Sequence, residues 1–460
     1  MIQLKKIGLL MMLSIMLLVS ACSGNGGGVS PSAPGGDSNG DPKGVTEGGP
    51  KTVVISVMHK DRFLESAAQK FEEKHKNIRI EIKEYKASED MGDSGLSMQA
   101  ISLADVEKYV QSVTTQVMSG KGSDLILMSE LPQDKFVDKK LLIDLNELLA
   151  KDSTIDRNAL YTNILKASQD GDGLYAMPIS FSLELFQGDT ELLKKANISV
   201  DPNEPWNWEQ FMEVAEKLKL QGDSEKLINL DPTSLLFDYI EDNYAELVGQ
   251  GKPNFDSDLF RNKLKEIKSM YDEGLLSDGM SFDGGQAVFR MAGIYSPEQA
   301  LTMPDGLDYY QKPGTSGKNN GAPFKPMYSW GINSKSNVQE EAWAFIAFML
   351  SDEMQASPNL AGLAMNKAAT NKKLKEVAEK IESGTLETMM PQNMLPSGET
   401  AKARVEAVEK QIAGTNFRRF SDMKVLIIAL EEFNTFMSGQ KSAEDVSKLI
   451  QNRVTTYLNE

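Results

Sequence analysis

A strand–helix–strand pattern near the start of the chain constrains the fold more than any other feature. Residues 52–58 (TVVISVM) form a β-branched run that is typical of a buried strand. Residues 63–74 carry apolar side chains at three- and four-residue spacing, which predicts an amphipathic helix. Ile78, Ile80 and Ile82 then alternate with charged residues, as in a second strand. Such a unit predicts a parallel sheet with a right-handed crossover, and therefore an α/β fold.

A second strand–helix unit lies at residues 328–355, where a short strand leads through a polar turn into a helix. We expect Ser336 or Asn337 to cap this helix at its start. The apolar side chains at helical spacing are those of Ala342, Phe345, Ile346, Met349 and Leu350. They form one face, which must pack against another part of the protein.

Further helices are predicted from apolar periodicity along the chain. Asn207 and Gln210 have the spacing of a capping box at the start of one of them. Gly120 lies between a helix and a strand at residues 125–128, which is the reverse of the order in a phosphate-binding loop, so we interpret it as a helix C-cap. The predicted helices are residues 106–118, 189–196, 208–218, 232–248, 255–271, 421–437 and 443–458.

The amino-terminal segment has the order of a secretory signal. Lys5 and Lys6 precede the apolar run 7–19, and small residues lead to Cys22. This arrangement resembles a bacterial lipobox, so we expect residues 1–21 to be a lipoprotein signal peptide and Cys22 to be lipidated. The alternative is a buried cysteine in an ordinary signal anchor.

Residues 22–50 are dense in Gly, Ser, Pro and Asn, with hardly an apolar side chain. Such a segment cannot bury enough surface to offset its ordering entropy, which predicts a flexible tether. No later stretch is long and apolar enough to span a membrane. We therefore expect the folded body to be held at the extracytoplasmic face of the cell membrane by its lipid anchor only.

Composition excludes several classes of function. The formal net charge is −17, and it becomes −19 without residues 1–21, which carry two lysines and no acid. Nucleic acids and anionic lipid surfaces require clustered cations, so neither is expected as the main partner. Cys22 is the one cysteine, and His59 and His75 are the two histidines. We therefore expect no metal site and no cofactor, and the lack of a catalytic motif predicts a protein that is not an enzyme.

Ligands of open α/β sheets bind beyond the carboxyl ends of the strands. After the first predicted strand, that position holds Met58, His59 and Asp61, and after the strand at 125–128 it holds Glu130. Each of them is a candidate contact. His59 or Asp61 can equally cap a helix and face water.

The order and spacing of the motifs carry more information than any one of them. The motifs are Thr52–Tyr85, Gly120–Met128, Gly173–Ser180, Leu192–Ala196, Trp206–Leu218, Gly285–Met291, Tyr328–Gln355 and the tail around Gly439, together with the lipobox. In this order they resemble the extracellular solute-binding proteins of family 1, the maltose- and oligosaccharide-type receptors of ABC importers. The resemblance covers essentially all of the chain after the tether. The loop at residues 87–103 is longer than the usual pattern, and no role is assigned to it.

The resemblance implies a periplasmic-binding-protein-like α/β fold with two lobes joined by a multi-crossing hinge. Lobe 1 would comprise residues 51–178 and 327–390, and lobe 2 would comprise residues 182–322 and 395–460. It also implies a receptor that closes its lobes on a small solute and delivers that solute to the permease subunits of an ABC importer. We expect the solute to be a carbohydrate and the protein to be a monomer.

A sugar presents hydroxyls around apolar faces, so its receptor needs aromatic side chains and paired polar groups. From their positions in the implied fold, Glu130, Tyr295 and Trp330 are the first candidates for ligand binding. The further candidates are Met58, His59, Asp61, Phe181 and Glu298. Trp330 has hinge packing as its alternative role.

Ligand identity and biological role stay open in the sequence. An oligosaccharide, a monosaccharide, a polyol or a peptide would each suit the fold. An anchored sensor or adhesin without transport would have the same architecture. A secreted glycosidase would need two carboxylates across a cleft, and no local pattern marks such a pair.

Overall fold

The computed structural model describes residues 49–86, 102–202, 204–220, 228–277, 287–314, 323–419 and 422–459. The predicted signal peptide (1–21), the lipidation site Cys22, nearly all of the tether (22–50) and most of the loop 87–103 lie outside these residues. In the ranges that are described, no helix is both long and apolar enough to cross a lipid bilayer.

The first sheet has five strands in the order β2-β1-β3-β11-β4. β1 is parallel to β2 and β3, whereas β11 is antiparallel to β3 and β4. Val53 and Ile55 have no exposed surface, because alternate side chains of β1 point into the core. Helix α1 (Arg62–Lys74) connects β1 to β2, which confirms the predicted β-α-β unit. The strands are β1 (Lys51–Val57), β2 (Ile78–Glu84), β3 (Leu125–Leu127), β4 (Met177–Pro178) and β11 (Ser329–Ile332).

The second sheet has eight strands and is built around the long, almost wholly buried strand β5 (Ser180–Asp189). Its order is β13-β10-β5-β8-β6-β7, and β9 and β12 also pair with β5. β5 is antiparallel to β8, β9, β10 and β12. The other strands are β6 (Ile228–Asn229), β7 (Leu276–Ser277), β8 (Phe289–Ile294), β9 (Leu307–Gln311), β10 (Pro323–Pro326), β12 (Leu363–Ala364) and β13 (Phe417–Arg418).

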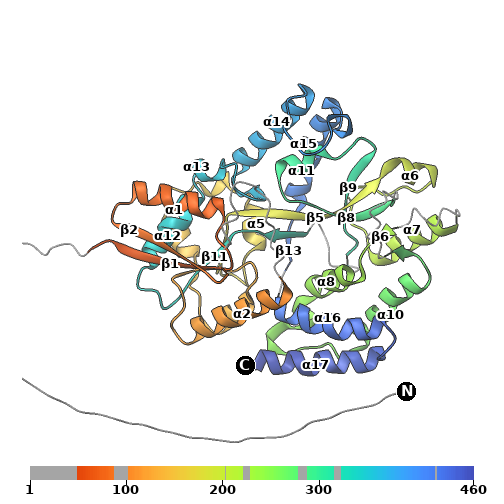
Figure 1. Cartoon of the computed structure of the whole chain (residues 1–460), viewed down its shortest axis with the longest axis horizontal. Helices are drawn as coiled ribbons and strands as arrows, with labels where there is room; N and C mark the ends of the chain where they lie inside the picture. The colour runs from red at the N-terminus through yellow and green to blue at the C-terminus, as the bar shows by residue number, and fades with distance from the viewer. Residues whose placement is uncertain are drawn as a thin grey trace, which may run out of the picture. The chain divides into compact units, whose positions relative to one another are not determined.

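Helices surround both sheets (Figure 1). Between β2 and β4 lie α2 (Leu103–Met118), α3 (Gln133–Asp138), α4 (Asn146–Lys151) and α5 (Thr162–Ala167), and between β11 and β12 lie α12 (Gln339–Met349) and α13 (Asp352–Gln355). Between β5 and β10 lie α6 (Thr190–Lys195), α7 (Trp208–Leu220), α8 (Pro232–Asp242), α9 (Tyr244–Leu247), α10 (Asp258–Asp272) and α11 (Pro297–Thr302). The last four are α14 (Lys367–Glu382), α15 (Gly398–Gly414), α16 (Met423–Met437) and α17 (Ala443–Asn459).

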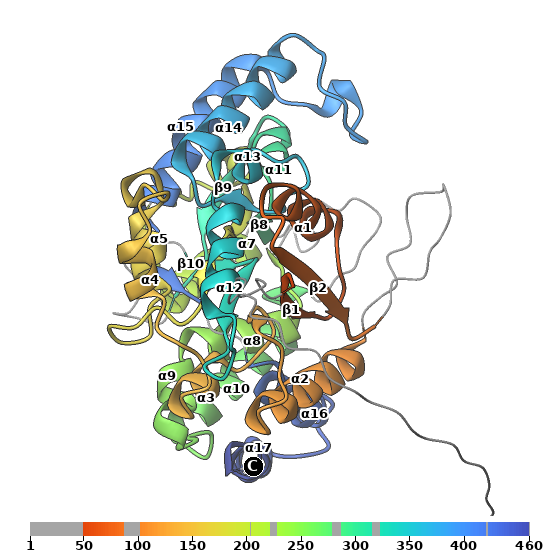
Figure 2. The same ribbon diagram turned by 90° about the vertical axis from the view of Figure 1, so that its left-hand side faces the viewer.

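The carboxyl-terminal helices form two pairs. α14 packs on α15, as Figure 2 shows, and α16 packs on α17 and on α2. Helices α16 and α17 confirm the prediction for the tail. α14 and α15 lie in a part of the chain for which no element was predicted.

Local capping determines several helix ends. Asn207 and Gln210 form the predicted capping box: the Gln210 amide donates to Asn207 Oδ1 at 2.9 Å, and Gln210 Oε1 accepts from the Asn207 amide at 2.8 Å. Gly120 follows α2 with a positive φ of 74°, and the amide of Lys121 donates to the Gln116 carbonyl at 2.9 Å. This is the predicted helix C-cap.

Two helix predictions need correction. The N-cap of α12 is Val338, not Ser336 or Asn337, and no side chain caps it. The Ser336 hydroxyl instead donates to Asp124 Oδ1 at 2.7 Å, a long-range bond that the local pattern does not contain. The predicted helix 232–248 is divided at Asn243, whose side chain donates to the carbonyl of Tyr239 at 2.8 Å.

One continuous hydrophobic core extends from the first sheet into the second. It contains Val53 of β1, Trp330 of β11, Phe181 of β5 and Phe324 of β10, all without exposed surface. The Phe181 ring meets the Phe324 ring edge to face, with centroids 6.2 Å apart. The junction between the two sheets is therefore apolar and closely packed.

Candidate functional site

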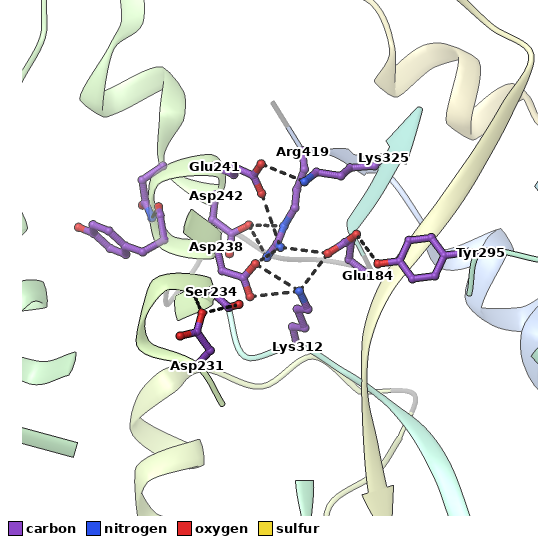
Figure 3. Close-up of polar contacts among 12 residues, drawn as sticks. Glu184, Asp231, Ser234, Asp238, Glu241, Asp242, Tyr295, Lys312, Lys325 and Arg419 are labelled. Atoms are coloured by element: carbon purple, nitrogen blue, oxygen red, sulfur yellow. Dashed lines mark hydrogen bonds and ion pairs between the residues drawn. The ribbon is translucent and has the colours of Figure 1, made fainter. Parts of the chain in front are cut away.

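Helix α8 carries three acidic residues on its buried side. Asp238, Glu241 and Asp242 lie at i, i+3 and i+4, so they occupy one face of the helix, and Asp238 and Glu241 are buried. Carboxylates in the interior require cationic partners, because an unpaired buried charge is very costly. The partners come from the second sheet (Figure 3).

Lys312 and Arg419 supply the positive charges that pair with these acids. Lys312 follows β9, and its Nζ lies 3.0 Å from Glu184 Oε2 and 3.1 Å from Asp238 Oδ2. Arg419 follows β13, and its guanidinium contacts Asp238 and lies 3.0 Å from Asp242 Oδ1. These side chains are almost fully buried, so this part of the network is closed to solvent.

The charges of the network shift the pKa values of its members in opposite directions. Burial by itself would raise the pKa of Glu184 and Asp238, but the charges of Lys312 and Arg419 outweigh burial and hold both pKa values below the ordinary range. For Asp242 burial prevails over the attraction of Arg419, and its pKa is raised to about 6. Glu184 and Asp238 therefore stay ionised and paired, which suits a structural support and not an acid–base catalyst.

Lys325 and Tyr295 are the solvent-exposed members of the network, and we call this part its open edge. Lys325, on β10, lies 3.1 Å from Glu241, and its side chain is 39% exposed. Tyr295, just after β8, is 44% exposed, and its hydroxyl donates to Glu184 Oε1 over 3.4 Å. Figure 3 shows both side chains approaching the network from the side opposite to α8.

Glu130, which follows β3 of the first sheet, faces this edge. Burial raises the pKa of Glu130, with Lys325 opposing the rise and Glu241 adding to it. Because the charges of Lys325 and Glu241 act on Glu130, the loop after β3 lies within electrostatic range of the network. The fold thus gathers Glu130 and Tyr295, two of the first three predicted contacts, around Lys325.

The loop after β1 contributes a smaller polar group. Asp61 caps α1 by accepting the amide of Leu64 at 2.8 Å, and it also accepts a hydrogen bond from the hydroxyl of Tyr328. Burial and the Asp61 charge together raise the pKa of Tyr328 above its ordinary range. His59 is half-buried, and within the part of the chain that is described its Nε2 has no hydrogen-bond partner.

Four predicted contacts lie elsewhere. Phe181 and Trp330 have no exposed surface, because the core that joins the two sheets covers them. Met58 is 8% exposed and packs in the cluster between α2 and β3. Glu298 is exposed in the first turn of α11, where it opposes the lowering of the Lys373 pKa by burial. We therefore do not include these four in the candidate site.

Sequence reasoning missed Lys325, Tyr328, Glu184 and the acids of α8. Their pairing joins residues far apart in the chain, such as Lys312 and Glu184, which are separated by 128 positions. One pattern was available: Asp238, Glu241 and Asp242 fall on the same side of a predicted amphipathic helix as its apolar residues. Acids on the core side of a helix indicate buried ion pairs.

The open edge offers an aromatic ring, a hydroxyl, an ammonium group and carboxylates within one small region. This combination can bind a polar, hydroxylated molecule through several hydrogen bonds. Among the residues that the structure describes, no group of three or more His, Cys, Asp or Glu side chains is arranged to hold a metal ion.

Comparison with known proteins gives one family match and many structural matches. The family model described as bacterial extracellular solute-binding protein matches residues 58–356. The comparison with curated proteins finds no match.

Solved structures with this fold include three whose titles name sugars or sugar binding. An ABC substrate-binding protein from Listeria monocytogenes in complex with cycloalternan has 17% identity and a TM-score of 0.55, covering 89% of this chain and 99% of that one. Maltose-bound MalE3 of T. maritima has 16% identity and a TM-score of 0.54, with coverages of 88% and 99%. The sugar-binding protein MalE of Xanthomonas citri has 16% identity and a TM-score of 0.58, with coverages of 89% and 98%. At these identities the similarity concerns the fold.

Proposed function

The chain belongs to the bacterial extracellular solute-binding protein family, and on that basis we propose that it captures a carbohydrate between two lobes and delivers it to an ABC importer. The family membership carries the solute-binding function. The cycloalternan and maltose complexes and the sugar-binding MalE among the structural relatives support carbohydrate as the class of solute.

Two lobes are the natural division of this fold. Lobe 1 would centre on the first sheet and lobe 2 on the second, although β12 (Leu363–Ala364), inside the range 327–390 expected for lobe 1, pairs with β5 of the second sheet. The chain passes from one sheet to the other between β4 and β5, between β10 and β11, and between β11 and β12. Such crossings support a hinge beside which the lobes close on a ligand.

The proposed solute contacts are Tyr295, Lys325, Glu130, Asp61 and His59. The observation that carries this assignment is the Tyr295 ring, which is 44% exposed beside charged and hydrogen-bonding groups of both sheets. An exposed ring suits the apolar face of a sugar, and the polar groups suit its hydroxyls. The buried network beneath keeps these groups in place.

Titration calorimetry against maltose, maltotriose, glucose, sorbitol and a tripeptide tests the function. We expect saturable binding of at least one saccharide and none of the peptide. Tyr295→Ala should weaken that binding, whereas Leu259→Ala, which removes an exposed apolar side chain from α10, should leave it unchanged. Binding of the peptide alone would contradict the carbohydrate assignment.

We also propose that binding occurs without turnover and that no cofactor takes part. Glu184 and Asp238, the ionised acids of the network, are held by cations and not opposed across an open gap. Prolonged incubation of a bound oligosaccharide with the protein should return it uncleaved. Release of shorter sugars would favour a glycosidase.

Lipid anchoring is a separate proposal, carried by the lipobox-like residues that end at Cys22. The expected product is a protein cut after residue 21, acylated on Cys22 and held outside the cell membrane, with residues 22–50 as the tether. Mass spectrometry of the protein from its native membrane should show the lipid on Cys22. Cys22→Ser should release the protein into the medium, and continued membrane retention of that variant would contradict the proposal.

Measuring cellular uptake of the bound saccharide distinguishes a transport role from a sensing role. Deleting the protein should abolish uptake of the bound saccharide if it supplies an importer. Normal uptake in the deletion strain would favour an anchored sensor or adhesin with the same fold.

A further inference from the structure

Helix α3 carries polar contacts that cross from the first-sheet side of the molecule to the second-sheet side. Asp134 Oδ2 on α3 lies 3.2 Å from the hydroxyl oxygen of Tyr244 on α9, and Figure 2 shows the two helices side by side. Lys135, the next residue of α3, donates from Nζ to the backbone carbonyl of Tyr457 on α17 at 3.3 Å. In the proposed division, α3 belongs to lobe 1, and α9 and α17 belong to lobe 2. These contacts therefore join the two lobes.

A second carboxylate, that of Asp422, shares the Tyr244 hydroxyl with Asp134. Asp422 belongs to lobe 2 and caps α16, and its Oδ2 lies 3.3 Å from the phenol oxygen. The hydroxyl has one proton, so it cannot donate to both carboxylates when both are ionised. A proton on one carboxyl group lets that group donate to the phenol oxygen while the phenol donates to the other group. One shared proton thus completes both hydrogen bonds.

Both carboxyl groups are shielded from water. Asp134 Oδ1 is buried, and among the described residues it has no hydrogen-bond partner. Asp422 is 2% exposed, and its Oδ1 accepts from the amide of Lys424 at 3.0 Å and lies 3.3 Å from the Tyr457 hydroxyl. Burial raises the pKa of Asp134, and burial together with the Asp134 charge raises the pKa of Asp422 to about 6. Bringing the two acids together therefore favours binding of a proton.

Other titratable or charged side chains face this pair from α3 itself, the turn after α5, β13, α16 and α17. They are Lys135, Asp138, Asp170, Arg418, Lys424 and Tyr457. The three cations contact other groups. Lys135 lies over the Tyr457 ring, Lys424 pairs with Glu107, and Arg418 donates to Gln133 Oε1 at 2.8 Å. Asp138 and Asp170 add negative charge, and the pKa of Asp134 stays raised in this setting.

We propose that Asp134, Tyr244 and Asp422 form a proton-dependent latch between the lobes, which favours the closed form of the protein in acid. This regulation rests on the proposed two-lobe function. Opening separates the two carboxylates, so neither raises the pKa of the other any longer. Because the closed form has the higher pKa, closing takes up a proton. The stabilisation is complete below the ordinary aspartate pKa of about 4 and is lost as pH rises to about 6.

Small-angle X-ray scattering of the ligand-free protein at about pH 5 and about pH 7.5 tests the latch. We expect a smaller radius of gyration at the lower pH. Asp134→Asn should give the same radius at both, because asparagine does not titrate and its carbonyl still accepts from Tyr244. Tyr244→Phe removes the bridging hydroxyl and should leave the protein more open than the parent at about pH 5. The control is Glu147→Gln, which removes an exposed acid of α4 and should behave like the parent.

Calorimetry with maltose and maltotriose provides a second measurement. Affinity of the parent for a sugar that binds should fall by up to about tenfold per pH unit between about pH 4 and 6, the effect of one proton, and by less in Asp134→Asn.

The latch is overturned if the radius of gyration of the parent is the same at both pH values. It is also overturned if Asp134→Asn changes with pH as much as the parent, or if Tyr244→Phe stays as compact as the parent at about pH 5. A lack of sugar binding at every pH would count against the proposed function, whereas the scattering of the ligand-free protein decides the latch by itself.

Discussion

Tyr244 and Asp422 join α9 to the start of α16 inside the protein, with the phenol oxygen 3.3 Å from Asp422 Oδ2. The same hydroxyl lies 3.2 Å from Oδ2 of Asp134, which comes from α3 on the first-sheet side. A hydroxyl has one proton to donate, so it cannot serve both carboxylates at once. Burial raises the pKa of both acids, that of Asp422 to about 6, and the Asp134 charge adds to the effect on Asp422.

This arrangement predicts a stability that depends on pH. The folded protein holds a proton on Asp422 at pH values where the unfolded chain has lost it, so the free energy of unfolding falls as pH rises from about 4 to 6. Asp422 alone would account for at most about 3 kcal/mol of that fall. Urea unfolding across this range is the measurement.

Asp422→Asn is the matched variant, because asparagine also caps helices well and carries no titrating charge. We expect its unfolding free energy to vary less between pH 4 and 6 than that of the parent. Asp242, whose pKa is likewise raised to about 6, contributes with the same sign and is unchanged in both proteins. An identical pH dependence in the two proteins would show that Asp422 does not titrate in this range.

The buried network predicts an asymmetric cost for losing one cation. Lys312→Met keeps the length of the side chain but removes one of the two cations that Glu184 and Asp238 share and leaves only Arg419 beside these buried acids, so the unfolding free energy should fall by about 3–5 kcal/mol. Arg79→Met removes a surface ion pair with Glu72 and should cost less than about 1 kcal/mol. Denaturant unfolding of both variants measures the two losses of unfolding free energy. A loss in Lys312→Met as small as that in Arg79→Met would mean that the network is solvated.

Tyr295→Ala should weaken binding of the captured saccharide by about 1–3 kcal/mol, the value of a lost aromatic contact. Because the ring is 44% exposed, the melting temperature without ligand should hardly change. Calorimetry gives the affinity and a thermal scan gives the stability. A large loss of stability with unchanged affinity would assign the ring to packing.

Trp330→Ala should behave in the opposite way. The indole is fully buried in the core between the two sheets, so its removal leaves a cavity and should cost about 3–5 kcal/mol of unfolding free energy. Trp343→Ala on α12 is a comparison, since that indole is also buried and donates to Asp152 at 2.9 Å. A stable Trp330→Ala protein with selectively weakened ligand binding would return Trp330 to the solute site.

Local patterns in the sequence determined the elements that depend on local forces. The periods of two and of three to four residues fixed β1, α1 and β2, because they encode which face of each element is apolar. The Asn207–Gln210 capping box and the turn at Gly120 were also readable, since their hydrogen bonds close within a few residues. The family resemblance supplied the two-sheet architecture.

Tertiary structure alone decided which side chains are buried and which partners they meet. Tyr295 and Trp330 look alike in sequence as aromatic residues near strand ends, yet one is exposed and the other has no surface at all. Asp238 meets Arg419 across 181 positions, because the chain after β13 returns to the buried face of α8. Pairing of this kind depends on long-range packing and desolvation, and neither leaves a periodic trace in the chain.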